Sequence, residues 1–395
     1  MSPLSHMVQL SVSVFMGMNY QCERFIRLLE IMQSDEKIIF HMERVQSVRK
    51  WIRTHHVCFV ASDPFTIRWM TGFTGSNGLL FLDQDQLVLI TDSRYTEQGP
   101  KELMKHGTDA NCLISPDPLK TVAELSESRD VFLDGEKFSW SVKKKLQNLI
   151  DGTVVDAHEF CSTMRGLKDE SEIAKIKKAA DITCRALDKA LSEIDDGTTE
   201  KQLAAKVEYF MSLEGASNAA YPPIIASGPN SALPHARPTD QRVLNTNLLL
   251  VDVGANYDGY CSDMTRVIPL SKLSEEQMKV SQKVLDAQER AIQMIRPGVT
   301  ANEIDAVCRN TLSENGLAKK FTHGAGHGVG LEIHEYPRIN RTSSDVIQEG
   351  MVITVEPGVY LEGSYGIRWE DLLVVTSKGV EYLTKYEKLT QVSKS

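Results

Sequence analysis

The chain has 395 residues, of which 42% are hydrophobic and 25% charged, and its formal net charge is -9. This length allows two domains of ordinary size. The negative charge argues against nucleic acid or an anionic membrane as the main partner, and no stretch approaches the ~20 apolar residues of a membrane helix. Seven scattered cysteines without a CxxC pair fit a reducing compartment, so we expect a cytoplasmic protein.

Residues 1–41 carry no pattern of a folded element. The apolar stretch Val8–Met18 lacks a basic segment before it and a clear cleavage site after it, which argues against a signal peptide. The first convincing amphipathic helix begins at Met42. We therefore expect residues 1–41 to be an extension that need not be ordered, with translation starting near Met42 as an alternative.

Short apolar runs alternate with helical patterns from Met42 to about Val155, as in an α/β domain. Residues 78–82 and 86–91 flank Asp83-Gln-Asp-Gln and predict a hairpin. Further patterns predict helices at 94–106 and 139–150 and strands near 57–61, 112–114, 131–134 and 153–155. The glycines of Gly72–Gly78 lack the GxGxxG spacing of a phosphate-binding loop. These patterns predict an α/β domain over residues 42–164.

The second half, residues 165–395, begins with a charged helical segment. Thr198 is the expected N-cap of a second helix, and later helices are predicted over 274–295 and, with Thr300 as cap, over 303–312. Strand-like runs alternate with these helices.

Two aspartates belong to a predicted hairpin of this domain. Asp252 interrupts the apolar run Leu248–Val253, and Asp263 lies in the next strand-like run. A hairpin centred between Tyr257 and Asp258 would place the two carboxylates opposite each other. Facing carboxylates in an apolar layer repel unless a cation lies between them. The alternative is one solvated Asp and one turn Asp.

A glycine-rich segment downstream holds three histidines. His323, His327 and His334 occur in Thr322–His334, and the glycines between them exclude an ordinary helix. Imidazole is the commonest metal ligand. His235, between prolines in the Tyr221–Asp240 loop, is either a site residue or a surface histidine.

Two glutamates complete the set of candidate ligands. Glu356 ends one apolar strand and Glu370 begins another, and a hairpin turning at Glu362–Ser364 would pair them. Four carboxylates with a histidine suit two hard or borderline divalent cations, Mn²⁺ or Co²⁺ over a thiolate-type Zn²⁺ site. Two such metals act on an acyl or phosphoryl centre. Because no phosphate-binding loop is present, we favour an acyl substrate.

Five motifs in this order, ALPHARPTD, VDVGANYDGYCSDMTR, HGAGHGVGLEIHE, VEPGVY and GIRWED, resemble the metal-dependent Xaa-Pro peptidases, aminopeptidase P and prolidase. The resemblance spans residues ~42–395. It implies an α/β N-terminal domain followed by an α+β pita-bread (creatinase/aminopeptidase-like) catalytic domain. It also implies two divalent metal ions, Mn²⁺ first with Co²⁺ or Zn²⁺ as alternatives, and a homodimer.

The resemblance also assigns roles to residues of this chain. The implied metal ligands are Asp252, Asp263, His327, Glu356 and Glu370, with Asp263 and Glu370 bridging the ions, Asp252 on one ion, and His327 and Glu356 on the other. Glu356 would move the proton from the nucleophile. His235 and His334 would steady the scissile carbonyl. The implied substrate contacts are Tyr221, His235, Arg368 and His323, and a supporting place behind the ligands is the alternative for His323. Trp369 departs from the family pattern and should point away from the metals.

The implied reaction is hydrolysis of the bond between an N-terminal residue and proline, so the expected partners are small peptides with proline at the second position. Aminopeptidase and dipeptidase share every motif quoted, and both remain open. Methionine aminopeptidase has the same ligands but typically lacks the N-terminal domain and the GIRWED form. A metal-free pita-bread domain that binds peptides is the non-enzymatic alternative, against which the complete ligand set argues. Creatinase-like enzymes lack the ligands.

Overall fold

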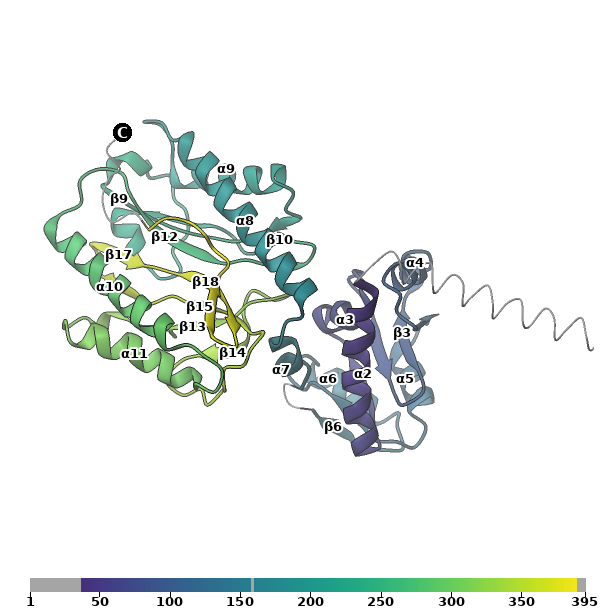
Figure 1. The fold of residues 1–395 in the computed structure, drawn as a ribbon. Coiled ribbons are helices and arrows are strands. Elements are labelled where there is room, and N and C mark those ends of the chain that lie inside the picture. The colour runs from purple at the N-terminus through teal and green to yellow at the C-terminus, as the bar shows by residue number, and fades with distance from the viewer. Residues whose placement is uncertain (1–36, 158–159, 389–395) are drawn as a thin grey trace, which may run out of the picture. The chain divides into compact units, whose positions relative to one another are not determined.

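A computed structural model describes residues 37–157 and 160–388 (Figure 1). The chain divides into two compact units, Met1–Glu159 and Phe160–Ser395. The extension expected at 1–41 lies outside the described residues as far as residue 36. Helix α2 spans Lys37–His55, so the first helix begins before Met42. No helix in the described ranges is both long and apolar enough to cross a membrane.

The N-terminal unit contains a mixed sheet with the strand order β4-β3-β2-β1-β5-β6. β1 pairs parallel with β5 and antiparallel with β2, and β2 with β3 forms the hairpin predicted at residues 78–91. The strands are β1 Cys58–Ala61, β2 Leu79–Leu82, β3 Leu87–Thr91, β4 Asn111–Ile114, β5 Val131–Leu133 and β6 Val154–Asp156. The sheet therefore has the α/β character expected from the alternating pattern.

Helices of this unit begin at strong capping signals. Asp63 and Asp117 cap helices that start with proline. This Asp-Pro signal marks two helices that were not predicted from the sequence. The helix predicted at 94–106 begins only at Gln98, because Asp92 caps a short 3₁₀ turn before it. The helices after α2 are α3 Pro64–Thr71, α4 Gln98–Lys105, α5 Pro118–Ser126 and α6 Trp140–Gln147.

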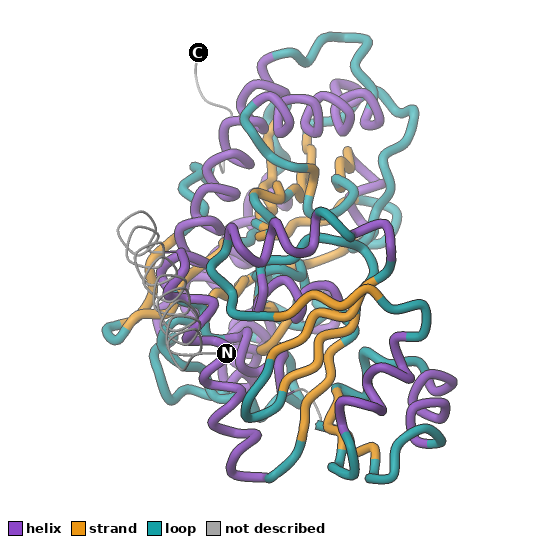
Figure 2. Tube along the Cα trace, turned by 90° about the vertical axis from the view of Figure 1, so that its right-hand side faces the viewer, coloured by secondary structure: helices purple, strands orange, loops and turns teal. Residues whose placement is uncertain are grey.

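Two adjacent helix pairs, α8 with α9 and α10 with α11, flank the strands of the C-terminal unit (Figures 1 and 2). The helices are α7 Phe160–Gly166, α8 Glu170–Ser192, α9 Glu200–Leu213, α10 Glu275–Met294 and α11 Ala301–Ser313. Capping boxes start α8 to α11, with Thr300 as predicted for α11. Thr198 was the wrong cap for α9: Thr199 caps it, while the Thr198 hydroxyl donates to Asp195.

The strands of the C-terminal unit form several small sheets between the helix pairs. Their orders are β12-β9-β8, β14-β13-β15-β18-β19, β11-β10-β7 and β16-β17. The strands are β7 Asn218–Ala219, β8 Ile224–Ser227, β9 Leu248–Val253, β10 Ala255–Tyr257, β11 Tyr260–Cys261, β12 Met264–Pro269, β13 Gly326–Gly328, β14 Glu335–Ile339, β15 Val352–Val355, β16 Gly358–Leu361, β17 Tyr365–Arg368, β18 Asp371–Thr376 and β19 Gly379–Tyr382.

The first predicted hairpin has a different register. Its turn is at Asp258 and Gly259, whose φ angles of 48° and 84° suit a two-residue hairpin turn. Asp252 therefore lies opposite Thr265, and the predicted pairing of Asp252 with Asp263 is wrong. The register differs by two residues. Because side chains alternate with period two, that difference leaves both aspartates on one face.

The second predicted hairpin is confirmed. Val355 lies opposite Asp371 in β15 and β18, and Gly358 lies opposite Arg368 in β16 and β17. Glu356 and Glu370 stand at corresponding positions where the chain passes from one strand pair to the other. This register brings the two glutamates to the same place in the fold.

Candidate metal centre

A pocket of about 650 Å³ in the C-terminal unit collects residues that are far apart in the sequence. Every site residue predicted from the sequence lines it. These residues are Tyr221, His235, Asp252, Asp263, His323, His327, His334, Glu356, Arg368 and Glu370. The strand ends and loops that carry them thus converge on one cavity.

Strand ends position the four carboxylates. Asp252 lies near the end of β9, and Asp263 directly precedes β12. Glu356 directly follows β15, and Glu370 directly precedes β18. Asp263, Glu356 and Glu370 lie just outside the paired strands, whereas Asp252 is still paired with Thr265 and Ile224. His327 comes from β13, which pairs with β15.

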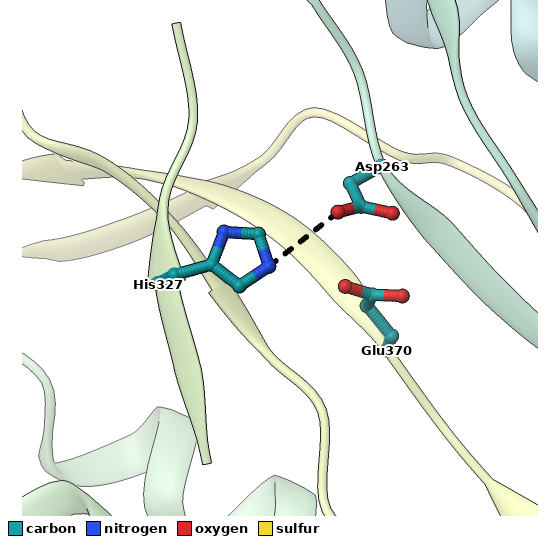
Figure 3. A group of neighbouring side chains, drawn as sticks. All are labelled: Asp263, His327 and Glu370. Carbon is teal, nitrogen blue, oxygen red and sulfur yellow. Dashed lines mark ion pairs between the residues drawn. The ribbon is translucent and has the colours of Figure 1, made fainter. Parts of the chain in front are cut away.

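Asp263, His327 and Glu370 form the tightest group of candidate ligands. One ligand atom from each lies within 4.8 Å of the others, and Figure 3 shows the imidazole and both carboxylates turned toward a common space. The His327 Nδ1–H donates to the Gly328 carbonyl over 3.0 Å, which leaves Nε2 as the ligand atom. This Nε2 lies 3.6 Å from Asp263 Oδ2 and 3.4 Å from Glu356 Oε1.

The electrostatics of this group call for a cation. Burial, followed by the neighbouring carboxylates, raises the pKa of Asp263 and of Glu370 well above the usual range. Burial also raises the pKa of Glu356 to about 7, with the charge of Asp252 adding to the effect. Closely spaced buried carboxylates of this kind are stabilised when a divalent ion neutralises them. The oxygen-rich donor set with one imidazole fits such an ion.

Asp252 differs from Asp263 in its partners. Its Oδ2 accepts from Nη2 of Arg368 over 2.5 Å, and its Oδ1 accepts from the Tyr221 hydroxyl over 2.5 Å. The same hydroxyl lies 2.5 Å from Oδ1 of Asp263. The protein therefore supplies a cationic partner to Asp252, whereas Asp263 faces the histidine and the other carboxylates.

The predicted histidines occupy three different settings. Both nitrogens of His323 contact protein atoms, the Gly324 carbonyl and the Tyr360 hydroxyl, so this side chain supports the site from within the protein. Burial lowers the pKa of His323 to about 3. His334 meets His327 edge to face, with ring centroids 4.4 Å apart. Burial and then His327 lower the pKa of His334 to about 4, so it is neutral near pH 7. His235 lines the pocket from an exposed loop position.

Arg368 and Trp369 point in different directions. The Arg368 guanidinium contacts Thr265, Pro234, Tyr360 and Asp252. Trp369 is fully buried in the core against α10, where its N–H donates to Ser281. The expectation that Trp369 points away from the metal ligands is confirmed.

Two arginines in the pocket wall were not predicted from the sequence. Arg237 and Arg338 line the cavity, and both residues are exposed. Within the described ranges, neither guanidinium forms an ion pair. Each follows a predicted histidine closely, Arg237 after His235 and Arg338 after His334. That spacing is the only sequence signal for them, since an exposed arginine is common.

Two family descriptions match this chain. The Creatinase/Prolidase N-terminal domain matches residues 44–166, and Metallopeptidase family M24 matches residues 174–377.

The chain belongs to metallopeptidase family M24. Its expected enzyme class is thereby confirmed, and membership in this family implies divalent metal ions. The α/β N-terminal domain followed by an α+β pita-bread catalytic domain is confirmed as the fold class.

Individual M24 relatives resemble the chain over most of its length. The Xaa-Pro dipeptidase of Pyrococcus furiosus is 44% identical over 88% of this chain and 99% of that protein. Among solved structures, the Xaa-Pro dipeptidase from Bacillus anthracis has a TM-score of 0.82 at 32% identity, covering 88% of this chain and 99% of that one. An X-Pro aminopeptidase from Thermotoga maritima has a TM-score of 0.77 at 35% identity, covering 85% and 99%.

Proposed function

We propose that this protein is a dinuclear-metal Xaa-Pro dipeptidase, which hydrolyses the bond between an N-terminal residue and a C-terminal proline. The observation that carries the proposal is the group of Asp263, His327 and Glu370 ligand atoms in a pocket that also holds Asp252 and Glu356. Relatives named Xaa-Pro dipeptidase at 43% and 44% identity support the substrate class.

The proposed metal site uses all five ligands. Asp263 and Glu370 would hold both ions, Asp252 would hold one of them, and His327 with Glu356 would hold the other. Mn²⁺ is the first choice for this oxygen-rich set, with Co²⁺ or Zn²⁺ as alternatives. When bound, the metals polarise the scissile carbonyl and lower the pKa of water. The unequal settings of Asp252 and Asp263 support these unequal roles.

The protein's own groups do the remaining work. Glu356 accepts a proton from the attacking water and passes it toward the leaving nitrogen. His334 is neutral near pH 7 and donates its N–H to the developing oxyanion, and His235 donates from the facing loop. Tyr221 holds the relative orientation of Asp252 and Asp263 through its hydroxyl.

The proline ring sets the shape requirement. An X-Pro bond has no N–H, so recognition depends on a pocket that fits the ring. Tyr221 and His235 line this pocket together with the apolar side chains of Pro222, Ile224 and Ile339. The mixture of apolar wall and polar groups is typical of small-ligand sites.

Arg338 supports a dipeptidase. A dipeptide carries its carboxylate on the proline itself, and an arginine in the pocket wall can pair with it in bidentate fashion. The guanidinium of Arg368, the arginine expected near the substrate, is already engaged by four protein groups. The second candidate is an Xaa-Pro aminopeptidase, which the similarity to the Thermotoga maritima structure favours.

We include three further elements in the proposal. The protein acts in the cytoplasm, which the free thiols of its described cysteines support. It forms a homodimer, as the resemblance noted above implies. Its substrates are small peptides with proline at the second position. A methionine aminopeptidase is disfavoured by the Creatinase/Prolidase N-terminal domain, and a metal-free peptide-binding module by the complete ligand set.

A kinetic experiment tests the proposal. The purified protein is assayed with X-Pro, X-Pro-Y and X-Pro-Y-Z peptides in Mn²⁺, Co²⁺ and Zn²⁺. Cleavage of X-Pro alone is the expected result. Faster turnover of the longer peptides means an aminopeptidase. Absence of cleavage of every X-Pro peptide would contradict the enzyme assignment, and release of N-terminal methionine without X-Pro cleavage would indicate the methionine aminopeptidase alternative.

A further inference from the structure

Glu200, the first residue of α9, is a fully buried carboxylate outside the metal centre. Its Oε1 accepts from the backbone N–H and the hydroxyl of Ser227, over 2.6 and 2.7 Å. Its Oε2 accepts from Asn230 Nδ2 over 2.8 Å and from the backbone N–H and hydroxyl of Thr239 over 2.8 and 2.7 Å. Five donors thus converge on one side chain.

Four of these donors, from Ser227 and Thr239, stand at the two ends of one segment, and the fifth, Asn230, lies within it. We call residues 228–238 the His235 loop. Ser227 precedes this loop and Thr239 follows it. Pro234, His235 and Arg237 of this loop line the pocket. One carboxylate therefore joins both ends of the segment that carries His235 to the site.

The middle of the His235 loop is held by the strand pair next to Glu370. The Pro234 carbonyl accepts from Nη1 of Arg368 over 3.2 Å, and the Ser231 hydroxyl accepts from the Gly366 N–H over 2.9 Å. Gly366 leaves no space for a side chain there, because a Cβ would meet the Ser231 carbonyl oxygen at 2.0 Å. The loop is thus clamped at its ends by Glu200 and at its centre by β17.

The chemistry of a carboxylate explains why Glu200 suits the task of holding the two ends of the His235 loop. A buried carboxylate is costly unless it is paired or fully hydrogen-bonded. No salt bridge to Glu200 is found in the described part of the chain, so its charge is balanced by the five donors and by the N-terminus of α9. Hydrogen bonds to an ionised acceptor are shorter and stronger than neutral ones. An amide in the same place would turn an NH₂ group toward the donors.

We propose that Glu200 is a positioning residue for catalysis, which holds the His235 loop so that His235 faces the substrate. This inference rests on the proposed function, because it assigns a purpose to the position of His235. Glu200 touches neither the metal ligands nor the substrate pocket wall. Its effect should therefore appear in turnover and in the order of the loop, and not in metal binding.

The test compares Glu200→Gln with the wild-type holoenzyme on Gly-Pro. We expect kcat/KM to fall at least about tenfold, mainly through kcat, since a small displacement of a positioned group has effects of this size. The metal content should stay at the wild-type level. In a His235→Ala background the same substitution should change kcat/KM less than about threefold, because the two residues act through one geometry.

Three further variants separate positioning from loss of stability. Thr239→Val removes one hydroxyl donor at nearly constant volume and should lower kcat, whereas Thr239→Ser keeps the donor and should restore it. Gln202→Ala is the matched control on the same helix. It removes the capping-box contact of α9 but none of the loop contacts, so kcat should stay at the wild-type value.

Hydrogen exchange supplies a readout that is independent of activity. Glu200→Gln should speed exchange of the amides of residues 228–238 relative to the rest of the C-terminal unit. Unchanged exchange there, equal losses of kcat in both His235 backgrounds, or an equal loss in Gln202→Ala would overturn the inference. A wild-type protein that cleaves no X-Pro peptide would instead overturn the proposed function, and the exchange experiment would still decide the role of Glu200.

Discussion

Nη2 of Arg368 lies 2.5 Å from Oδ2 of Asp252, and this ion pair joins the two hairpins that carry the carboxylates of the candidate metal centre. Both side chains are buried. The pair gives Asp252 a fixed cationic neighbour before any metal binds. It also explains why the two aspartates of one hairpin have different surroundings.

Arg368→Ala should destabilise the protein and reduce activity. Removing one partner of a buried ion pair leaves the other charge uncompensated, at a cost of roughly 3–5 kcal/mol in unfolding free energy. We expect kcat/KM to fall at least about a hundredfold as Asp252 loses its orientation. Arg368→Lys keeps the charge but lacks the planar guanidinium, so its stability and kcat/KM should lie between those of the wild type and Arg368→Ala. Urea unfolding and steady-state kinetics provide the measurements.

The control for this prediction is Arg290→Ala. Arg290 pairs with Glu314 on the surface, with both side chains more than half exposed, so stability and turnover should hardly change. If Arg368→Ala changed the unfolding free energy and kcat/KM as little as Arg290→Ala, the ion pair with Asp252 would contribute to neither stability nor activity.

Asp263→Asn should abolish the binding of both metals. Asp263 is proposed to contribute to both ions, and an amide carries no charge to offset them. We expect loss of metal measured by elemental analysis and a fall in kcat/KM of at least about a hundredfold. Asp286→Asn on the surface of α10 is the matched control. Retention of two metals with full activity in Asp263→Asn would rule out a bridging role.

The metal-free protein should become less stable as the pH rises toward neutrality. The pKa of Glu356 in the folded chain is about 7, against an ordinary 4.5, so between these values the folded state holds a proton that the unfolded state has lost. This contribution to stability is complete below about pH 4.5 and disappears as pH passes 7. The melting temperature of chelator-treated protein should therefore be lower at about pH 8 than at about pH 5.5.

Glu356→Gln and added metal are the two comparisons for this pH effect. The amide cannot titrate, so the variant should show a smaller difference between the two pH values. Metal displaces the proton, so metal affinity should rise with pH up to about 7. A metal-free wild type whose melting temperature is the same at both pH values would contradict the assignment.

Arg338→Ala should weaken the binding of dipeptides more than that of longer peptides. A hydrogen-bonded charge pair contributes enough for a roughly 10–100-fold rise in KM for X-Pro. X-Pro-Y places its carboxylate one residue further on and should be less affected. Arg338→Lys should restore part of the loss. Arg341→Ala, an exposed neighbour outside the catalytic pocket, is the control. Equal losses for both substrates would contradict the dipeptidase proposal.

Local sequence determined much of the site. Glu356 and Glu370 could be paired from the sequence, because an apolar strand, a short turn and a second strand leave few registers that bury the right faces. The turn of the first hairpin was harder to place, because Tyr257–Gly259 contains several turn-forming residues. The positive φ angles of Asp258 and Gly259 decided the register. The two-residue difference moved the pairing of Asp252 but left its face unchanged.

Only the tertiary structure decided which distant side chains form ion pairs and hydrogen bonds with one another. The sequence cannot show that Arg368 lies against Asp252, that Arg338 faces the cavity, or that Glu200 collects donors from both ends of the His235 loop. These contacts join segments that are more than a hundred residues apart or that form irregular loops. In such loops, no periodic sequence pattern indicates which way a side chain points. Motif and strand pattern therefore identified the candidate ligands, and packing decided their partners.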